Sequence, residues 1–396
     1  MRYTIGQLAE IIDGDRGKNY PKQGEFYPQG YCLFLNTGNV TKEGLTFEEN
    51  QFITKEKDEA LRKGKLKRGD IVYTTRGTVG NAGYYNSNVP YENVRINSGM
   101  VILRANGEIV DARFLYQILK SEYYRPYFKQ YCTGSAQPQL PIKNFSQIYL
   151  NVPDIKTQHR IADILSAYDD LIENNQKQIK LLEEAAQRLY KEWFVDLRFP
   201  GHENTKIVDG VPEGWNEKTL SQVANVIMGQ SPKSEFYNSE KKGLPFHQGV
   251  GSYGVRFVMD DIYSTSYTRI AEPNSILFSV RAPVGRLNIT KNKVVIGRGL
   301  AAINQTDGCQ SYLYYLLKNR FFKDNIVGNG SIFASVSKDE LLNQKFLIPE
   351  RNLMMQFEKI VSQMDKQIEN LDSKNKKLIE ARDRLLPKLM SGEVEV

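Results

Sequence analysis

The stretch that decides the fold is residues 161–193, which read IADILSAYDDLIENNQKQIKLLEEAAQRLYKEW. Apolar side chains recur there at alternating steps of four and three residues, and Asn175 interrupts the series. This spacing predicts a long helix whose narrow seam pairs with a second helix in a coiled coil. The alternative is an amphipathic helix that packs only on its own domain. The seam positions are Ile161, Leu165, Tyr168, Ile172, Asn175, Ile179, Leu182, Ala186, Leu189 and Trp193.

A matching series occupies residues 357–389, which read FEKIVSQMDKQIENLDSKNKKLIEARDRLLPKL. Each run exceeds four heptads and would span roughly 50 Å as a helix. Four apolar residues on or beside the first seam are expected to be exposed, which would indicate that the helices carry partner proteins; these are Leu171, Trp193, Phe194 and Val195. The second seam consists of Phe357, Val361, Met364, Ile368, Leu371, Asn375, Leu378, Arg382, Leu385 and Leu389.

The two asparagines predict how the helices run. Asn175 is the fifth of ten seam positions and Asn375 is the sixth of ten. In a parallel pair each amide would face an apolar residue, at a cost of about 1–3 kcal/mol apiece. In an antiparallel pair the two amides meet and satisfy each other. We therefore expect an intramolecular antiparallel coiled coil whose register is set by Asn175 and Asn375.

The helices belong to a repeat that covers the whole chain. A shift of 196 residues lays residues 134–190 on residues 330–386, with Asp169 on Asp365, and a shift of 205 lays residues 70–80 on residues 275–285. This period is far longer than that of solenoid repeats. It indicates a duplicated domain and two similar sites related by a pseudo-two-fold axis.

The sequence between the helices predicts the fold class α/β (α+β). Short strand-like runs alternate with turns rich in Gly, Asn and Pro, and one short helix is expected in each half, at 114–120 and 312–318. We expect a first globular domain at 1–153, the first long helix at 154–197, a linker at 198–211, a second domain at 212–349, and the second helix with a tail at 350–396.

Composition sets loose limits on function. The 53 basic and 46 acidic residues give a net charge of +7, which suits binding to a polyanion but is also common in enzymes. Three cysteines imply no disulfide framework. The N-terminus has no apolar secretory core and no stretch approaches a membrane span, so we expect a cytoplasmic protein.

Sequence signals for catalysis are missing. No Gly-x-x-x-x-Gly-Lys-Ser/Thr loop and no nucleophile elbow occur. His159, His202 and His247 have no metal-ligand spacing among themselves or with the cysteines. We therefore expect no catalytic residues and no metal site.

Three places could contact nucleic acid. Arginines in glycine turns suit phosphate or guanine, and small polar side chains with a lysine suit backbone and base-edge contacts. The alternatives are ordinary hairpins and capped turns. The third place is a loop that differs between the halves, as two readers of unlike sequences would require. The candidates are Arg76, Arg281 and Arg286 in the first place, Gln137, Lys143 and Lys338 in the second, and Lys18, Asn19, Tyr20, Ser231 and Lys233 in the third.

Over its whole length the chain resembles the specificity subunits of type I restriction-modification systems. The resemblance rests on the order of several motifs around two long helices. These are GDRGKNYP at 14–21, GDIVYTTRGTVG at 69–80, the Gly-Ser-x-x-Pro turn at 134–138, QHRIADILSA at 158–167, LYKEWFVD at 189–196, the Pro-x-Gly-Trp start at 212–215 and LLPKLMSGEV at 385–394.

The resemblance implies a sequence-specific, non-catalytic DNA-binding subunit for DNA modification and host defence. Each globular domain would be a target recognition domain for one half of a split DNA site. The helices would set the gap and dock two methyltransferase subunits. Those partners would bind S-adenosylmethionine, and restriction/translocase subunits, where present, would use ATP and Mg²⁺. Two other interpretations remain open from the residues: a coiled-coil scaffold that does not bind DNA, and a self-contained methyltransferase.

Overall fold

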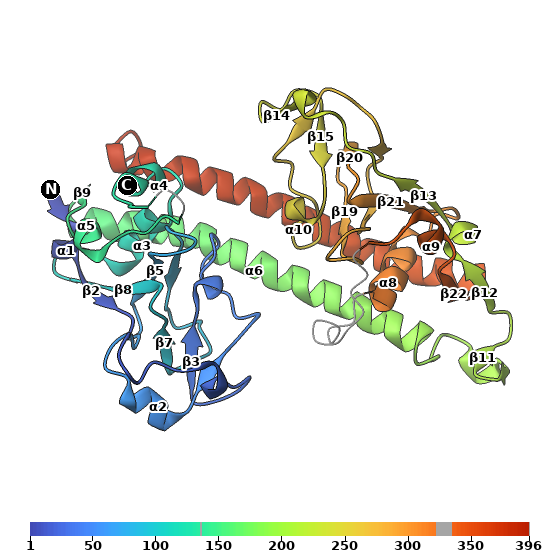
Figure 1. Cartoon of the computed structure of the whole chain (residues 1–396), viewed down its shortest axis with the longest axis horizontal. Helices are drawn as coiled ribbons and strands as arrows, with labels where there is room; N and C mark the ends of the chain where they lie inside the picture. The colour runs from blue at the N-terminus through green and yellow to red at the C-terminus, as the bar shows by residue number, and fades with distance from the viewer. Residues whose placement is uncertain (135–136, 322–334, 396) are drawn as a thin grey trace. The chain divides into compact units, whose positions relative to one another are not determined.

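The computed structural model describes residues 1–134, 137–321 and 335–395. The chain divides into two compact units (Figure 1). Unit 1 comprises Met1–Gln176 and Asp372–Val396, and unit 2 comprises Lys177–Leu371. Each unit therefore contains one sheet domain and a part of both long helices.

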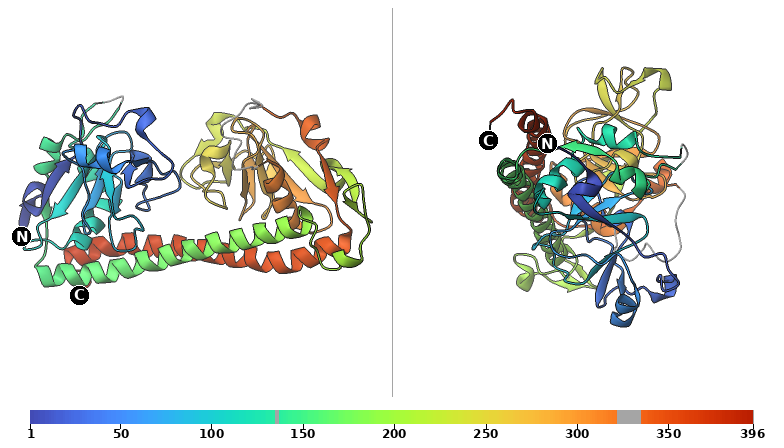
Figure 2. Two further views of the ribbon diagram at one scale, coloured as in Figure 1. Left: turned by 90° about the horizontal axis from the view of Figure 1, so that it is seen from below. Right: turned by 90° about the vertical axis from the view of Figure 1, so that its left-hand side faces the viewer.

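The long helices are α6 (Ile155–Phe194) and α10 (Arg351–Ser391), which lie side by side in Figure 2. In unit 1 the beginning of α6 shares an apolar core with the end of α10, through Ile161 and Leu389. In unit 2 the end of α6 meets the beginning of α10, where the rings of Tyr190 and Phe357 lie 5.9 Å apart. The predicted antiparallel pairing is confirmed, and every seam position named above is buried or half-buried.

The two seam asparagines lie in contact within unit 1. Asn175 Nδ2 donates to Asn375 Oδ1 at 2.8 Å, and Asn375 Nδ2 lies 3.5 Å from the Ile172 carbonyl oxygen. Asn375 is buried, so its amide depends on these protein partners.

Within its described residues, unit 1 holds three sheets and three apolar cores. The largest is antiparallel in the order β2-β8-β5-β6, the second has the order β4-β3-β7 with β3 and β7 parallel, and β1 pairs with β9. The strands are β1 (Arg2–Thr4), β2 (Ala9–Asp13), β3 (Cys32–Leu35), β4 (Phe52–Ile53), β5 (Ile71–Thr74), β6 (Ala82–Tyr84), β7 (Val94–Ile96), β8 (Met100–Ala105) and β9 (Tyr149–Asn151).

Unit 2 repeats this plan. Its antiparallel sheet β13-β21-β18-β19 corresponds to β2-β8-β5-β6, its parallel pair β15 and β20 to β3 and β7, and its pair β12 and β22 to β1 and β9. The strands are β10 (Ile207–Val208), β11 (Val211–Pro212), β12 (Asn216–Thr219), β13 (Ala224–Met228), β14 (Tyr237–Asn238), β15 (Leu244–His247), β16 (Tyr263–Ser264), β17 (Ile270–Ala271), β18 (Ile276–Ser279), β19 (Leu287–Ile289), β20 (Val294–Ile296), β21 (Leu300–Gln305) and β22 (Lys345–Ile348).

One short helix in each unit packs between the sheet and the long helices. In unit 1, α3 is almost entirely buried because its side chains fill the space between the sheet and α6. In unit 2, α8 takes the same place. The short helices are α1 (Ile5–Leu8), α2 (Lys55–Ala60), α3 (Ala112–Lys120), α4 (Arg125–Lys129), α5 (Ile142–Ser146), α7 (Leu220–Val223), α8 (Gln310–Phe321) and α9 (Lys338–Leu342).

A buried ionic cluster holds the unit 1 domain to both long helices. Asp169 on α6 accepts from Lys120 Nζ on α3 at 2.8 Å and from Arg382 Nη1 on α10 at 2.7 Å. Burial alone would raise the pKa of the Asp169 carboxyl, but the charges of Lys120 and Arg382 hold it below its usual range. The aspartate therefore stays ionised and ties three helices together.

Unit 2 has its own cluster around Arg256. This side chain is buried, and its Nη2 donates to Asp365 Oδ1 on α10 at 2.6 Å. Its Nη1 lies 3.5 Å from Glu183 Oε1 on α6. The guanidinium also stacks on Tyr314 of α8, 3.7 Å from the ring centroid. Asp365 is the residue that the 196-residue shift matches with Asp169.

The expectation of exposed apolar residues beside the first seam is wrong for two of its four residues. Trp193 is buried, with its ring 6.0 Å from that of Phe357, and the Phe194 ring lies 5.0 Å from that of Tyr312. The end of α6 is covered by α8 and α10, so these rings belong to the unit 2 core. Leu171 and Val195 are exposed.

We expect Asn175→Leu to lower the free energy of unfolding of unit 1 by about 1–3 kcal/mol, because it leaves the buried Asn375 amide without its partner. The double variant N175L/N375L should lose less than the sum of the single losses, because neither amide is then stranded. Hydrogen exchange of the α6 and α10 amides in unit 1 measures this. Asn174→Leu, the same change at the exposed neighbour, is the control. Strictly additive losses would contradict the pairing.

Arg256→Met should lower the stability of unit 2 by about 3–5 kcal/mol, because Asp365 would lose the partner of its ion pair. Both tryptophans of the chain, Trp193 and Trp215, lie in the unit 2 core, so tryptophan fluorescence in urea follows this unit selectively. The double variant R256M/D365N should recover part of the loss. Lys345→Met is the control, because it removes only an exposed ion pair with Glu217 and should change the urea midpoint of unfolding little. If Arg256→Met shifted the midpoint no more than Lys345→Met, Arg256 would not be a buried anchor.

Candidate nucleic-acid interface

The turns that carry Arg76 and Arg281 are built by the same device. Thr74 Oγ1 accepts from the backbone N–H of Asn81 at 2.9 Å and donates to the backbone carbonyl of Thr78. In unit 2, Ser279 Oγ accepts from the Arg286 amide at 2.8 Å and donates to the Pro283 carbonyl at 2.6 Å. A hydroxyl at the end of the strand thus closes each hairpin and leaves the arginine side chain exposed.

A second segment lies beside each of these turns. In unit 1 Arg76 forms an antiparallel bridge with Gln139, and the Leu140 amide donates to the Thr75 carbonyl at 2.9 Å. In unit 2 Arg281 forms the equivalent bridge with Ser335. The structure therefore brings the exposed Gln137 near the Arg76 turn. Parts of the predicted second place, residues 135–136 and 330–334, lie outside the described residues.

The predicted lysines that follow these segments are exposed. Lys143 lies on α5, and Lys338 is the first residue of α9. The α9 terminus is closed by Ser337, whose Oγ accepts from the Glu340 amide at 3.3 Å. Lys338 therefore projects from an ordered helix start, with Glu340 two residues further on.

The loop at 14–20 is held by a buried carboxylate. Asp15 accepts from the amides of Gly17 at 2.6 Å and Arg62 at 2.7 Å. Burial acts to raise the pKa of Asp15, but these backbone donors hold it below its usual range. Asn19 Nδ2 donates to the Ala60 carbonyl at 2.9 Å, and the edge of Tyr20 meets Phe34. Asn19 and Tyr20 thus take part in the fold, whereas Lys18 is exposed.

The corresponding loop of unit 2 meets the turn between β20 and β21. The Gln230 amide donates to the Ile296 carbonyl at 2.9 Å, and Ser231 Oγ accepts from the Arg298 amide at 3.2 Å. Arg281 and Arg298 both line an open cavity of about 560 Å³ that extends to Glu340. Lys233 is exposed beyond this loop.

Arg298 was missed by the sequence reasoning. Its local signal is weak, because it is a single arginine between Gly297 and Gly299. A comparison of the two halves would have found it, since the turn between β7 and β8 has Ser98 where the turn between β20 and β21 has Arg298.

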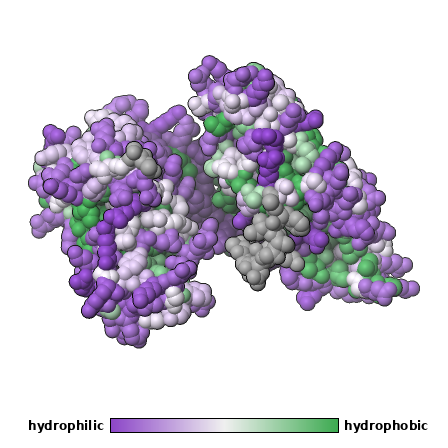
Figure 3. Space-filling model, in the orientation of Figure 1, coloured by the Kyte–Doolittle hydropathy of each residue, from purple (hydrophilic) through white to green (hydrophobic). Residues whose placement is uncertain are grey.

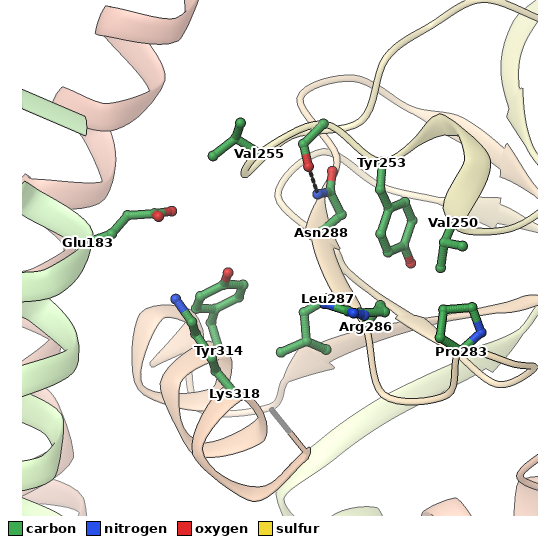
Figure 4. A pocket seen from close by; sticks show the side chains of 11 residues that line it. Glu183, Val250, Tyr253, Val255, Pro283, Arg286, Leu287, Asn288, Tyr314 and Lys318 are labelled. Atoms are coloured by element: carbon green, nitrogen blue, oxygen red, sulfur yellow. Dashed lines mark hydrogen bonds between the residues drawn. The ribbon is translucent and has the colours of Figure 1, made fainter. Parts of the chain in front are cut away.

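Arg286 lies in a different place from Arg281. It lines a cavity of about 400 Å³ with Tyr253, Asn288, Tyr314 and Glu183 (Figure 4). The residues that line this cavity and those around Arg281 do not overlap. The two predicted arginines therefore do not share one cavity.

The remaining predicted cations are available to a polyanion. Hydrophilic residues dominate the visible surface in Figure 3. Within the described part of the chain, six of the predicted cations have no side-chain hydrogen bond or ion pair: Lys18, Arg76, Lys143, Lys233, Arg281 and Lys338. A cation with no internal partner can pair with phosphate without first breaking a protein contact.

The described residues contain neither a metal-binding cluster nor a membrane-spanning helix. No group of three or more His, Cys, Asp or Glu side chains gathers there as a metal ion would require. No helix in the same residues is long and apolar enough to cross a membrane.

The duplicated sheet domains, the exposed basic turns and the paired helices are those of a DNA-specificity protein, as the family match shows. The family model for the type I restriction modification DNA specificity domain matches residues 1–184 and again 212–381. The chain belongs to this family of specificity subunits, which are non-catalytic. It is the DNA-specificity subunit of a type I restriction-modification system.

Its relatives extend over the whole chain. A putative type I restriction enzyme specificity subunit (MjaX) of Methanocaldococcus jannaschii is 28% identical over 404 residues, covering 100% of this chain and 94% of the relative. The HindI specificity subunit of Haemophilus influenzae is 26% identical over 469 residues, which cover 98% of this chain and 100% of that subunit. The crystal structure of a type I S subunit from M. genitalium has the same fold, with a TM-score of 0.55 at 18% identity over 98% of this chain and 95% of that one.

We expect Arg76→Ala and Arg281→Ala each to weaken DNA binding by the assembled restriction-modification complex. If the arginine contacts phosphate, affinity should fall about equally for all sequences and the salt dependence should drop by roughly one counterion. If it reads a base, discrimination at one position should fall by about 1–3 kcal/mol. Binding titrations at several salt concentrations on cognate and scrambled duplexes separate the two. Arg198→Ala, an exposed arginine in the segment before β10, is the control. Unchanged affinity and preference in both variants would exclude these turns from the interface.

Proposed function

We propose that each sheet domain reads one half of an asymmetric, bipartite DNA site. In this proposal residues 1–153 and 212–349 are the two target recognition domains and residues 154–197 and 350–396 are the helical segments. The linker 198–211 joins the first helix to the second domain. The observation that carries it is a repeated strand order with unlike loops at equivalent places. A common scaffold supports docking on a common duplex backbone, and unlike loops support the recognition of unlike sequences.

The charges of these loops agree with such a role. Contacts from lysine and arginine to phosphate orient a protein on the duplex, while base-edge contacts in the grooves carry the sequence information. Lys18 and Arg76 would serve the first half-site, and Lys233 and Arg281 the second. Gln137, Lys143 and Lys338 lie on the segments beside the arginine turns and would add backbone contacts. Asn19, Tyr20 and Ser231 would act mainly by holding their loops in shape, as their hydrogen bonds and ring contacts suggest.

The long helices would set the gap between the half-sites and dock two methyltransferase subunits. Apolar residues on their surfaces support this role: Leu171 and Leu181 of α6 are 52% and 65% exposed, and Met355 of α10 is 52% exposed. Exposed apolar side chains of this size on a helix are suited to burial against a partner protein. The Asn175–Asn375 contact would keep the helix register, and hence the gap, fixed.

The chemistry of the complex would reside in the partner subunits. The methyltransferase subunits would bind S-adenosylmethionine and methylate adenine within the site. Restriction/translocase subunits, where the system has them, would bind ATP and Mg²⁺. The complex would act on DNA in the cytoplasm.

A base-resolution methylation map of the native host, with and without this gene, tests the proposal. We expect one split motif of two unlike half-sites with a fixed gap to lose its methylation when the gene is deleted. Complementation with a chimaera whose residues 212–349 come from a relative should change one half-site and keep the other. An unchanged map, together with a failure to co-purify any methyltransferase, would instead favour a scaffold that does not bind DNA.

A further inference from the structure

The turn between β20 and β21 places an arginine at the meeting point of the unit 2 loops. Gly297-Arg298-Gly299 connects the two strands, and the Val280 amide, next to Arg281, donates to the Gly299 carbonyl at 2.9 Å. In unit 1 the equivalent turn is Asn97-Ser98-Gly99, and the Thr75 and Arg76 amides donate to the Gly99 carbonyl at 2.9 and 3.1 Å. The backbone is alike in the two units, whereas the central side chain differs.

The backbone of Arg298 is fixed from both sides. Its amide donates to Ser231 Oγ, and this hydroxyl in turn donates to Gln248 Oε1 at 2.7 Å. The Gly297 amide donates to the His247 carbonyl at 2.8 Å. A Cβ at Gly299 would lie 2.5 Å from the Gln248 carbonyl oxygen, so the close approach of the two segments requires glycine there. The turn is therefore rigid, while the Arg298 side chain is exposed and has no partner among the described residues.

Unit 1 brings a guanidinium to the equivalent turn from another loop. Arg16 Nη2 donates to the Ser98 carbonyl oxygen at 3.2 Å and to Asp13 Oδ1 at 3.2 Å. The Arg16 side chain keeps 44% of its surface exposed. Its loop is fixed by the buried Asp15, as described above. Each domain thus presents an arginine at this turn. In unit 2 the arginine, Arg298, belongs to the turn itself, whereas in unit 1 Arg16 reaches the turn from the neighbouring loop.

We propose that Arg298 and Arg16 are specificity-determining residues, each of which reads a guanine in its own half-site. The inference rests on the proposed function and names the residues that make the half-sites differ. A guanidinium pairs with guanine O6 and N7 through two parallel hydrogen bonds, and this contact requires a firmly positioned arginine. The rigid turn under Arg298 and the Asp13 contact of Arg16 supply that positioning. Phosphate contacts are left to the exposed lysines and turn arginines around them.

The test uses the full chain in its native complex, with Arg298→Ala and Arg298→Lys as variants. Binding to a randomised duplex library should show that discrimination at one G·C pair of one half-site falls about 5- to 100-fold in both variants, because lysine keeps the charge but cannot form the bidentate pair. The other half-site should remain as in the wild type. Arg16→Ala should relax the opposite half-site by a similar factor. Arg198→Ala should leave both half-sites unchanged.

Three results would overturn the inference. Preference could stay intact while affinity falls uniformly and Arg298→Lys restores it, which would make Arg298 a phosphate contact. Arg298→Ala and Arg16→Ala could both retain the wild-type preference and affinity. Alternatively, Arg298→Ala and Arg16→Ala could both relax the same half-site. Each of these results leaves the proposed function standing as long as the wild-type complex selects a bipartite site from the library, whereas a wild type without such a site would remove the proposed function itself.

Discussion

Each sheet domain depends on a half-buried carboxylate that ties it to the paired helices. Asp169 and Asp365 occupy matching positions in the repeat, and each accepts from a cation that the sheet domain contributes, Lys120 in unit 1 and Arg256 in unit 2. A buried ion pair adds little net stability compared with apolar packing, but breaking one half of it is costly. The pairs therefore act chiefly as orientation constraints. In unit 1 Lys120 of α3 makes the pair directly, and in unit 2 Arg256 stacks on Tyr314 of α8 while it pairs with α10. Each pair thus holds a short helix of the sheet domain against the long helices.

The seam of the long helices adds a second constraint of the same kind. An apolar seam alone tolerates slippage, because each heptad resembles the next. The Asn175–Asn375 contact removes this freedom, since any shift would leave the buried side-chain amide of Asn375 and the half-buried one of Asn175 without each other. At the end of α6 the rings of Phe194 and Tyr190 pack against Phe357 of α10, and these bulky rings fit together in one register only. Polar pairing thus specifies the register in unit 1, and ring packing specifies it in unit 2.

Much of the architecture could be predicted because its signals are local or periodic. The step of four and three residues gave the helices, and the position of Asn175 and Asn375 in that series gave their direction. The strand-like runs at 70–74 and 275–279 contain β5 (Ile71–Thr74) and β18 (Ile276–Ser279). The exposure of Phe194 was misjudged because the seam shows which face of a helix meets the other helix, but not which domain covers the remaining faces. Trp193 lies on the seam itself and packs there against Phe357 of α10. Arg298 was overlooked for a related reason: a lone arginine in a turn gains meaning only when the loops that converge on that turn are known.

The residues that hold each domain are separate from those proposed to read DNA. Arg256 is buried between three helices, so its replacement disturbs the whole unit. Arg298 projects from a turn whose hydrogen bonds are all made by backbone atoms and by the side chains of Ser231 and Gln248. Replacing its side chain removes no described contact, and exposed changes of this kind usually alter stability by less than about 0.5 kcal/mol. The same holds for Ser98 at the equivalent turn of unit 1, where the carbonyl rather than the side chain receives Arg16. A duplicated scaffold built in this way can acquire a new half-site preference in one domain at almost no cost to its fold, and this physical separation explains how two domains with one strand order come to carry unlike loops.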